Sequence, residues 1–143
     1  MVSRAQQKQR VVGMPALADT FMLTKFGQST PHLWIVITTP DPNDDYRIIM
    51  VNVTTQHAHS DPTTVLVVGD HPFIRQPSVV YYSDARCVPG SLIDGNLRAG
   101  LSKAQPAVSS AVLLRIQSGI DRSTFTPQEI KDAFAAARAA GLA

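Results

Sequence analysis

Four histidines are the side chains of this sequence best suited to proton transfer. They are His32, His57, His59 and His71. An imidazole donates or accepts a proton near neutral pH, so two histidines that the fold brings together can supply both an acid and a base. A single loop histidine is more often only a solvated side chain. The elements around each histidine therefore decide whether two of them can meet.

A second kind of chemistry is suggested by the spacing of His57, His59 and Asp61. Alternate residues of an extended segment point to the same side, so these three side chains could bind a transition metal, with Asp70 or His71 completing the set. Short His-x-His matches are common by chance, however, and a polar loop explains the segment without a metal. We therefore expect neither a metal site nor another cofactor.

Other familiar chemical motifs are missing from the sequence. Cys87 is the only cysteine, so no internal disulfide can form, which agrees with a reducing compartment, and we expect a buried structural thiol. The sequence contains no Gly-rich phosphate loop, no paired cysteine ligands and no Gly-x-Ser-x-Gly elbow. These absences argue against a nucleotide-dependent enzyme and an α/β hydrolase.

Length and composition fit one small domain. The chain has 143 residues, of which 44% are hydrophobic and 17% are charged, and its formal net charge is +2. No apolar run approaches the roughly 18 residues that a membrane span needs. The first residues are basic but no apolar segment of a secretory signal follows, so we expect a cytoplasmic protein with a flexible basic tail over residues 1–17.

Short segments rich in β-branched and aromatic residues predict a mainly β protein. The expected strands cover residues 21–26, 32–39, 46–54, 64–68 and 78–88. The second and third strands flank a Pro/Asn/Asp turn at residues 40–45 and should form an antiparallel hairpin. Because no helix separates the five strands, we expect a small antiparallel sheet that curls into a barrel.

The turn at residues 70–73 is expected to be structural. An aspartate in this position typically accepts backbone N–H groups, so Asp70 should stabilise the turn, and Phe73 should plug the end of the barrel.

Helices are expected after the strands. Residues 89–99 could form a short helix. A second helix should start at Ser109 or Ser110, run through Gln117 and stop at Gly119. The last helix should start with a capping box formed by Thr126 and Glu129.

Three segments together resemble the PemK/MazF-like toxin family. They are residues 31–40 (PHLWIVITTP), 48–55 (IIMVNVTT) and 78–86 (SVVYYSDAR). In that family a basic residue and a proline lead an apolar strand, and a later strand ends in a Thr-Thr or Thr-Ser pair. Each motif alone is weak, and their order and spacing over residues 18–118 carry the resemblance.

The resemblance implies an SH3-like barrel domain over residues 18–119 and an additional C-terminal helix over residues 120–143. It also implies a homodimer that acts as a ribosome-independent endoribonuclease and is neutralised by an antitoxin protein. The chain departs from the family at one site position, where His32 replaces an arginine at the start of the second strand. Whether RNA cleavage survives this replacement is left open by the sequence.

RNA cleavage by the 2′-hydroxyl requires a base, an acid and a donor to the phosphate oxygens. In such a barrel His32 begins strand two and His57 follows strand three, so the two should lie near each other. Thr54 and Thr55 should share that edge, and Thr55 is the expected phosphate donor. Three arginines could line a phosphate groove, namely Arg47, Arg75 and Arg86.

Two alternatives to a nuclease remain open from the sequence. One is a non-catalytic protein-interaction module on the same barrel. The other is a metal-binding protein that uses His57, His59 and Asp61.

Overall fold

The computed structural model describes residues 13–24 and 30–143 and shows mainly antiparallel sheet with three helices. Most of the tail predicted over residues 1–17, and the end of the strand predicted over residues 21–26, lie outside the described residues. Within the tail, Pro15 and Ala16 are buried. The strands are β1 (Thr20–Thr24), β2 (Pro31–Val36), β3 (Arg47–Thr55), β4 (Val65–Leu66), β5 (Ser78–Val80), β6 (Arg86–Pro89) and β7 (Ser102–Gln105). The helices are α2 (Gly90–Arg98), α3 (Ser110–Arg122) and α4 (Gln128–Ala139), with a 3-10 turn η1 (Tyr82–Asp84).

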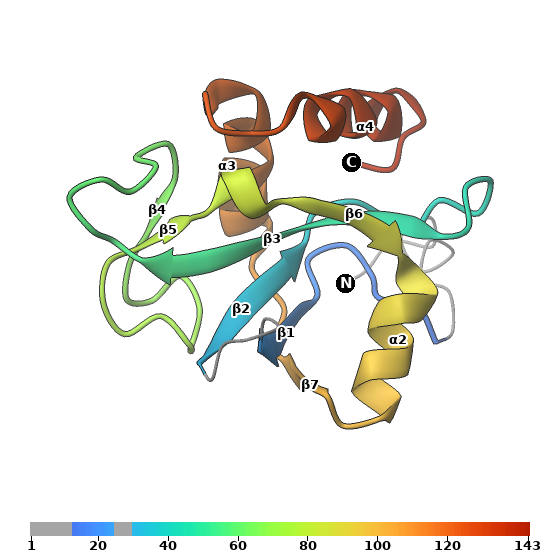
Figure 1. Ribbon diagram of the computed structural model, residues 1–143, viewed down its shortest axis with the longest axis horizontal. Helices are drawn as coiled ribbons and strands as arrows, with labels where there is room; N and C mark the ends of the chain where they lie inside the picture. The colour runs from blue at the N-terminus through green and yellow to red at the C-terminus, as the bar shows by residue number, and fades with distance from the viewer. Residues whose placement is uncertain (1–12, 25–29) are drawn as a thin grey trace.

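The long strand β3 lies at the centre of the sheet (Figure 1). Its partner on one side is β2, in the antiparallel hairpin that the sequence predicts. On the other side, β6 pairs with the first half of β3 and β5 with the second half. The strand order is β4-β5-β3-β2-β1-β7, and no pairing among the described residues joins β4 to β7. The predicted antiparallel sheet with C-terminal helices is confirmed, whereas a closed barrel is not shown.

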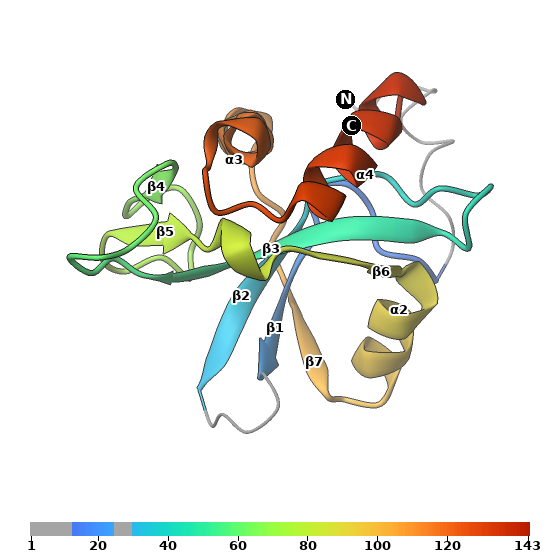
Figure 2. The ribbon, with the colours of Figure 1, turned by 45° about the horizontal axis from the view of Figure 1, so that its top comes forward.

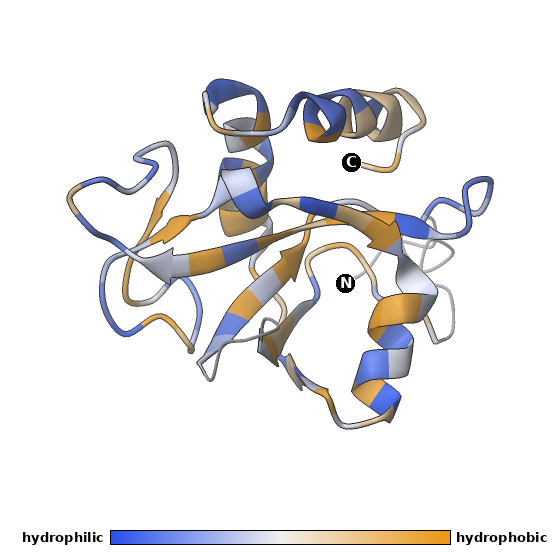
Figure 3. Ribbon diagram, in the orientation of Figure 1, coloured by the Kyte–Doolittle hydropathy of each residue, from blue (hydrophilic) through white to orange (hydrophobic). Residues whose placement is uncertain are grey.

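Helices cover both faces of the sheet. Figure 2 shows α3 and α4 on one side of β3 and α2 on the other. The apolar core under α3 and α4 includes Leu33, Ile35, Val51, Ile116 and Phe134. The core under α2 contains Phe21, Trp34, Val36, Ile48, Met50 and Ile93. The amphipathic banding of α2 is visible in Figure 3. Successive residues of β2 and β3 point alternately into these two cores, as strand geometry requires of a sheet that is covered on both faces.

The strand predicted over residues 78–88 is interrupted, which corrects the prediction. The turn η1 separates β5 from β6 and directs the Tyr82 ring into the core, where it is fully buried. Its hydroxyl donates a hydrogen bond to the Ile116 carbonyl at 2.7 Å and lies 2.8 Å from Thr64 Oγ1. Burial raises the pKa of Tyr82 to about 12. Tertiary packing of one ring thus overrides the β-propensity of the segment.

Gly119 does not end α3, which continues to Arg122. This glycine is buried, and a Cβ atom placed on it would overlap the ring and hydroxyl of Tyr82 and lie 2.6 Å from Thr64 Oγ1. The absence of a side chain therefore lets α3 approach the Tyr82 hydroxyl. Ser109 caps the helix as predicted, since its Oγ accepts the Val112 N–H at 3.2 Å.

The last helix starts differently from the prediction. Pro127 is the N-cap residue, and the buried Thr126 Oγ1 makes no hydrogen bond to a described residue, so the predicted capping box is wrong. Ile130 and Phe134 of α4 belong to the same core as α3, and the predicted boundary between residues 119 and 120 falls inside α3. The final helix is therefore part of the main core.

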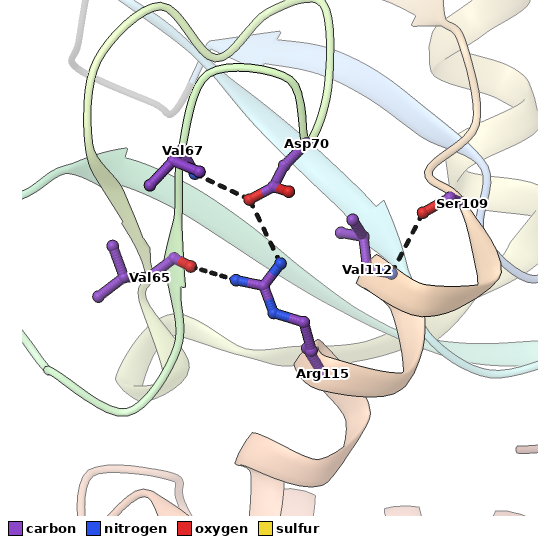
Figure 4. A network of polar contacts seen from close by, with 6 residues as sticks. All are labelled: Val65, Val67, Asp70, Ser109, Val112 and Arg115. Carbon is purple, nitrogen blue, oxygen red and sulfur yellow. Dashed lines mark hydrogen bonds and ion pairs between the residues drawn. The ribbon is translucent and has the colours of Figure 1, made fainter.

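The outer edge of β4 is closed by side chains rather than by another strand (Figure 4). Asp70 Oδ2 accepts the Val67 N–H at 2.8 Å, as expected of an aspartate before this turn. Arg115 of α3 donates to the Val65 carbonyl at 2.5 Å and contacts Asp70 at 3.3 Å. Phe73, in contrast, is 42% exposed and plugs nothing, which corrects the second half of that prediction.

None of the helices in the described ranges is long and apolar enough to cross a membrane.

We predict opposite effects for two Gly→Ala substitutions in helices. Gly119→Ala should lower the free energy of unfolding by about 2–4 kcal/mol, because the new methyl group must displace Tyr82. Gly95→Ala in α2 meets nothing within 4 Å and should raise it by about 0.5–1 kcal/mol through helix propensity. Urea unfolding followed by Trp34 fluorescence measures both. A stabilising Gly119→Ala would contradict the packing described.

Tyr82 also predicts an alkaline loss of stability. The folded state keeps the phenol proton up to about pH 12, whereas an unfolded tyrosine loses it near pH 10. The contribution of Tyr82 to the free energy of unfolding is therefore complete below pH 10. It falls by about 2–3 kcal/mol as the pH rises toward 12. Tyr82→Phe should be less stable at neutral pH but should lose less stability over this alkaline range. Equal alkaline losses in both proteins would contradict the prediction.

Candidate functional site

Two adjoining hollows lie around the ends of β2 and β3, and both are lined by His32 and Thr54. The first hollow, of about 600 Å³, includes Thr55, Arg75, Gln76 and Gln105. The second hollow, of about 490 Å³, includes Asn52, His57, His59, Asp61, Tyr81, Ser83 and Phe125. His32 and Thr54 are thus shared by the two spaces, which contain side chains from opposite faces of β3, with Thr55 in the first and Asn52 in the second. The two spaces together are called the groove.

The hairpin register brings His32 and Thr54 together. Leu33 pairs with Val53 in the antiparallel β2–β3 ladder, so the next opposite positions are His32 and Thr54. Side chains at opposite positions share a face of the sheet, whereas Thr55 points to the other face. Thr55 lines the first hollow only and accepts a hydrogen bond from Gln76 Nε2 at 3.3 Å. Thr54, rather than Thr55, is therefore the threonine that lies with both histidines.

The backbone fixes the tautomer of His32. Its Nδ1 lies 3.3 Å from the Val53 carbonyl oxygen, which can only accept a hydrogen bond. Nδ1 therefore carries a proton, and in the neutral ring Nε2 keeps its lone pair. The side chain is half-buried at the border of both hollows. A neutral His32 is thus equipped to accept a proton from a molecule bound in the groove.

His57 enters the second hollow from the loop after β3. The loop turns back at once, since the backbone N–H of His57 donates to Ser60 Oγ at 2.7 Å. The imidazole itself is exposed and makes no hydrogen bond to a described residue. His57 lines this hollow together with His32. His59 lines the same hollow and is also exposed.

Asp61 does not serve as a metal ligand. One carboxylate oxygen accepts the Ser123 hydroxyl at 2.6 Å, and the other accepts the backbone N–H and hydroxyl of Thr63 at 3.0 and 2.6 Å. Among residues 13–24 and 30–143, no three His, Cys, Asp or Glu side chains form a group that could hold a metal ion. The structure therefore contradicts the interpretation of His57, His59 and Asp61 as a metal site.

The structure brings one of the three predicted arginines to the groove. Arg75 is exposed, lines the first hollow and makes no hydrogen bond or ion pair with a described residue. Arg47 lies at the opposite end of β3, about 26 Å of strand from Thr55, and is paired with Asp44 at 3.6 Å. Arg86 stacks over the Trp34 ring at 5.6 Å and contacts Asp84 at 3.3 Å, outside the residues that line either hollow.

His71 has a structural role beneath the first hollow. The ring is buried, its Nδ1 accepts the Phe73 N–H at 3.0 Å, and its Nε2 donates to the Pro106 carbonyl at 2.7 Å. Thr20 Oγ1 lies 3.2 Å from the same nitrogen. These contacts hold the segment that carries Arg75 against β1 and the end of β7.

Cys87 is half-buried in β6 rather than fully buried as predicted. Burial raises the pKa of its thiol, which disfavours the reactive thiolate.

Sequence reasoning missed several residues of the second hollow, among them Asn52, Tyr81 and Phe125. The alternation of Trp34, Asn52 and Thr54 on one sheet face could have indicated the first of these. Tyr81 was assigned to an unbroken strand. Nothing in the local sequence indicates that Phe125 lines the same hollow as residues of β2 and β3.

Comparison with known proteins finds no family model and no curated protein that matches the chain. The resemblance to PemK/MazF-like toxins therefore remains a prediction from the three segments.

We predict that the histidines differ sharply in their effect on stability. His71→Ala should lower the free energy of unfolding by about 2–4 kcal/mol, because it removes a buried ring together with its hydrogen bonds to the Pro106 carbonyl and the Phe73 N–H. His57→Ala, at an exposed site, should change it by less than about 0.5 kcal/mol. Urea unfolding of both variants measures the difference, and equal effects would contradict the structural role of His71.

Proposed function

We propose that this protein binds single-stranded RNA along the two hollows and cleaves it without a metal ion. The observation that carries the proposal is the position of His32 and Thr54 between the two spaces. His57 lies on one side of this pair and the unpaired Arg75 on the other. A phosphate at His32 would thus lie between a hollow that contains a proton donor, His57, and a hollow that contains a guanidinium, Arg75.

The chemistry follows from these groups. His32 Nε2 takes the proton of the ribose 2′-hydroxyl, and the 2′-oxygen forms a bond to phosphorus. The bond from phosphorus to the 5′-oxygen breaks, and protonated His57 gives its proton to that oxygen. The products are a 2′,3′-cyclic phosphate and a 5′-hydroxyl. Thr54 and Arg75 stabilise the phosphate oxygens, where charge increases in the transition state.

The wider setting follows the family that the sequence resembles. We propose a cytoplasmic toxin that acts as a homodimer and is neutralised by an antitoxin protein. We also interpret the curled antiparallel sheet as an open form of an SH3-like barrel. The pairing of β3 with β6 along its first half and with β5 along its second half supports this interpretation, because one strand then takes part in both halves of a curved sheet.

We predict that His32→Ala and His57→Ala each reduce cleavage of an unstructured RNA by about 10²–10⁴-fold in the presence of a chelator. Both side chains lie outside the core, so the variants should fold normally. Cleavage is measured with end-labelled RNA, and a 2′-deoxy substitution at the cleaved position should abolish it. Full activity in His32→Ala would show that the reaction occurs elsewhere.

Two arginines supply a matched control for binding. Arg75→Ala should weaken RNA binding and reduce its dependence on salt by about one phosphate contact, whereas Arg47→Ala should change neither. RNA that is bound but stays intact in every condition would favour the non-catalytic binding module. Induced expression that leaves bacterial growth and transcripts unimpaired would point the same way.

A further inference from the structure

We propose that Phe125 and Tyr81 form an aromatic platform on which an unpaired nucleobase stacks in the second hollow. This inference rests on the proposed function and names the part of the RNA that the second hollow takes. Phe125 lies between α3 and α4, in the region that the resemblance marks as additional to the family. The C-terminal part of the chain would thus supply a residue of the binding groove.

Both rings are exposed where a ligand could reach them. Phe125 is 55% exposed and Tyr81 is 42% exposed, and both line the second hollow. An exposed aromatic ring gives up much of the free energy that its burial in the core would contribute. Aromatic faces of this kind bind successive bases of single-stranded nucleic acids without strong sequence preference.

A buried polar link holds Phe125 in this position. Ser123 is fully buried, and its Oγ accepts the Phe125 N–H at 3.1 Å while donating to Asp61 Oδ2 at 2.6 Å. Asp61 is itself 5% exposed and lines the second hollow. The backbone of Phe125 is therefore linked through Ser123 to Asp61, a buried residue that lines the same hollow. This link fixes the position of Phe125 before a ligand binds.

The polar groups of the second hollow suit the edge of a base better than an aliphatic ligand. Ser60 and Ser83 contribute hydroxyl groups to its lining. Asn52 is completely buried, donates from Nδ2 to Asp84 at 2.6 Å, and has no hydrogen-bond partner for Oδ1 among the described residues. An unsatisfied acceptor next to stacking rings favours a ligand that carries N–H donors, as the nucleobases do.

The neighbouring hollow explains why the base should belong to a chain. Arg75 lines the other hollow, and His32 and Thr54 are common to both. An RNA chain with a base on Phe125 and Tyr81 that passes His32 would therefore bring a phosphate toward the guanidinium of Arg75. Stacking on one side and ionic contact on the other match the two contributions that bind single-stranded nucleic acids. A neutral aromatic ligand would use only the first.

The test compares Phe125→Ala with Leu114→Ala, which removes an exposed apolar side chain of α3 outside both hollows. The probes are an unstructured RNA oligonucleotide, made non-cleavable by 2′-deoxy or 2′-methoxy groups, and inorganic polyphosphate, which has no bases. Phe125→Ala should weaken RNA binding about 5- to 150-fold with an unchanged salt dependence. Its affinity for polyphosphate should be that of the wild type, and Leu114→Ala should bind both probes normally.

A second variant distinguishes aromatic stacking on the base from simple apolar contact with it. Phe125→Leu keeps apolar bulk without a ring, so it should bind RNA as weakly as Phe125→Ala. Wild-type affinity in either variant, or an equal loss of polyphosphate binding, would overturn the platform while leaving the proposed function in place. Wild-type protein that binds no RNA at all would contradict both proposals.

Discussion

The burial of Tyr82 beneath α3 is the interaction on which the rest of the structure depends. Its hydroxyl joins three parts of the chain, because it contacts Thr64 before β4 and the Ile116 carbonyl and Gly119 of α3. To reach this position the backbone must leave the sheet at η1, which divides the neighbour of β3 into two strands. The same turn leaves Tyr81 and Ser83, on either side of Tyr82, in the lining of the second hollow.

Polar groups at the border of the groove are divided between structure and potential chemistry. Asp61 belongs to the spacing that suggested a metal site, and Asp70 or His71 could have completed that site; each of these three side chains is held by contacts within the protein. The side chains of His57, His59 and Arg75, in contrast, have no partners among the described residues. The side chains that have hydrogen-bond partners hold the loops in place, and the loops present the side chains without partners to the groove.

The parts of the fold that could be predicted are those determined by neighbouring residues. The β2–β3 hairpin follows from two apolar runs around a Pro/Asn/Asp turn, and its register also places His32 opposite Thr54. The interrupted strand could not be predicted, because Tyr82 leaves the sheet for partners far along the chain. The strand β7 was missed because the sequence of Ser102–Gln105 has no β-branched or aromatic residue.

The site shows the same division between local and distant determinants. His32, Thr54 and His57 were predicted to meet because they lie at the ends of adjacent strands, and they line one hollow. The metal-binding alternative for Asp61 stayed open in the sequence because its hydrogen-bond partner Ser123 is 62 residues away. Phe125 was missed because exposure in a connecting segment depends on how α3 and α4 pack, which no local pattern encodes.

The distance in sequence between β1 and β7 also has a consequence for the order of synthesis. Thr20, at the start of β1, is bonded to Pro106, 86 residues later, and α3 and α4 follow still further on. A nascent chain that has released only residues up to His57 already contains His32, Thr54 and His57 but lacks β7, the strand beside β1, and both α3 and α4. Since domains fold as their residues leave the ribosome, the groove is completed only after the segment between α3 and α4, which carries Phe125, has been synthesised. The proposed acid and base are therefore synthesised well before the residues that complete the pocket around them.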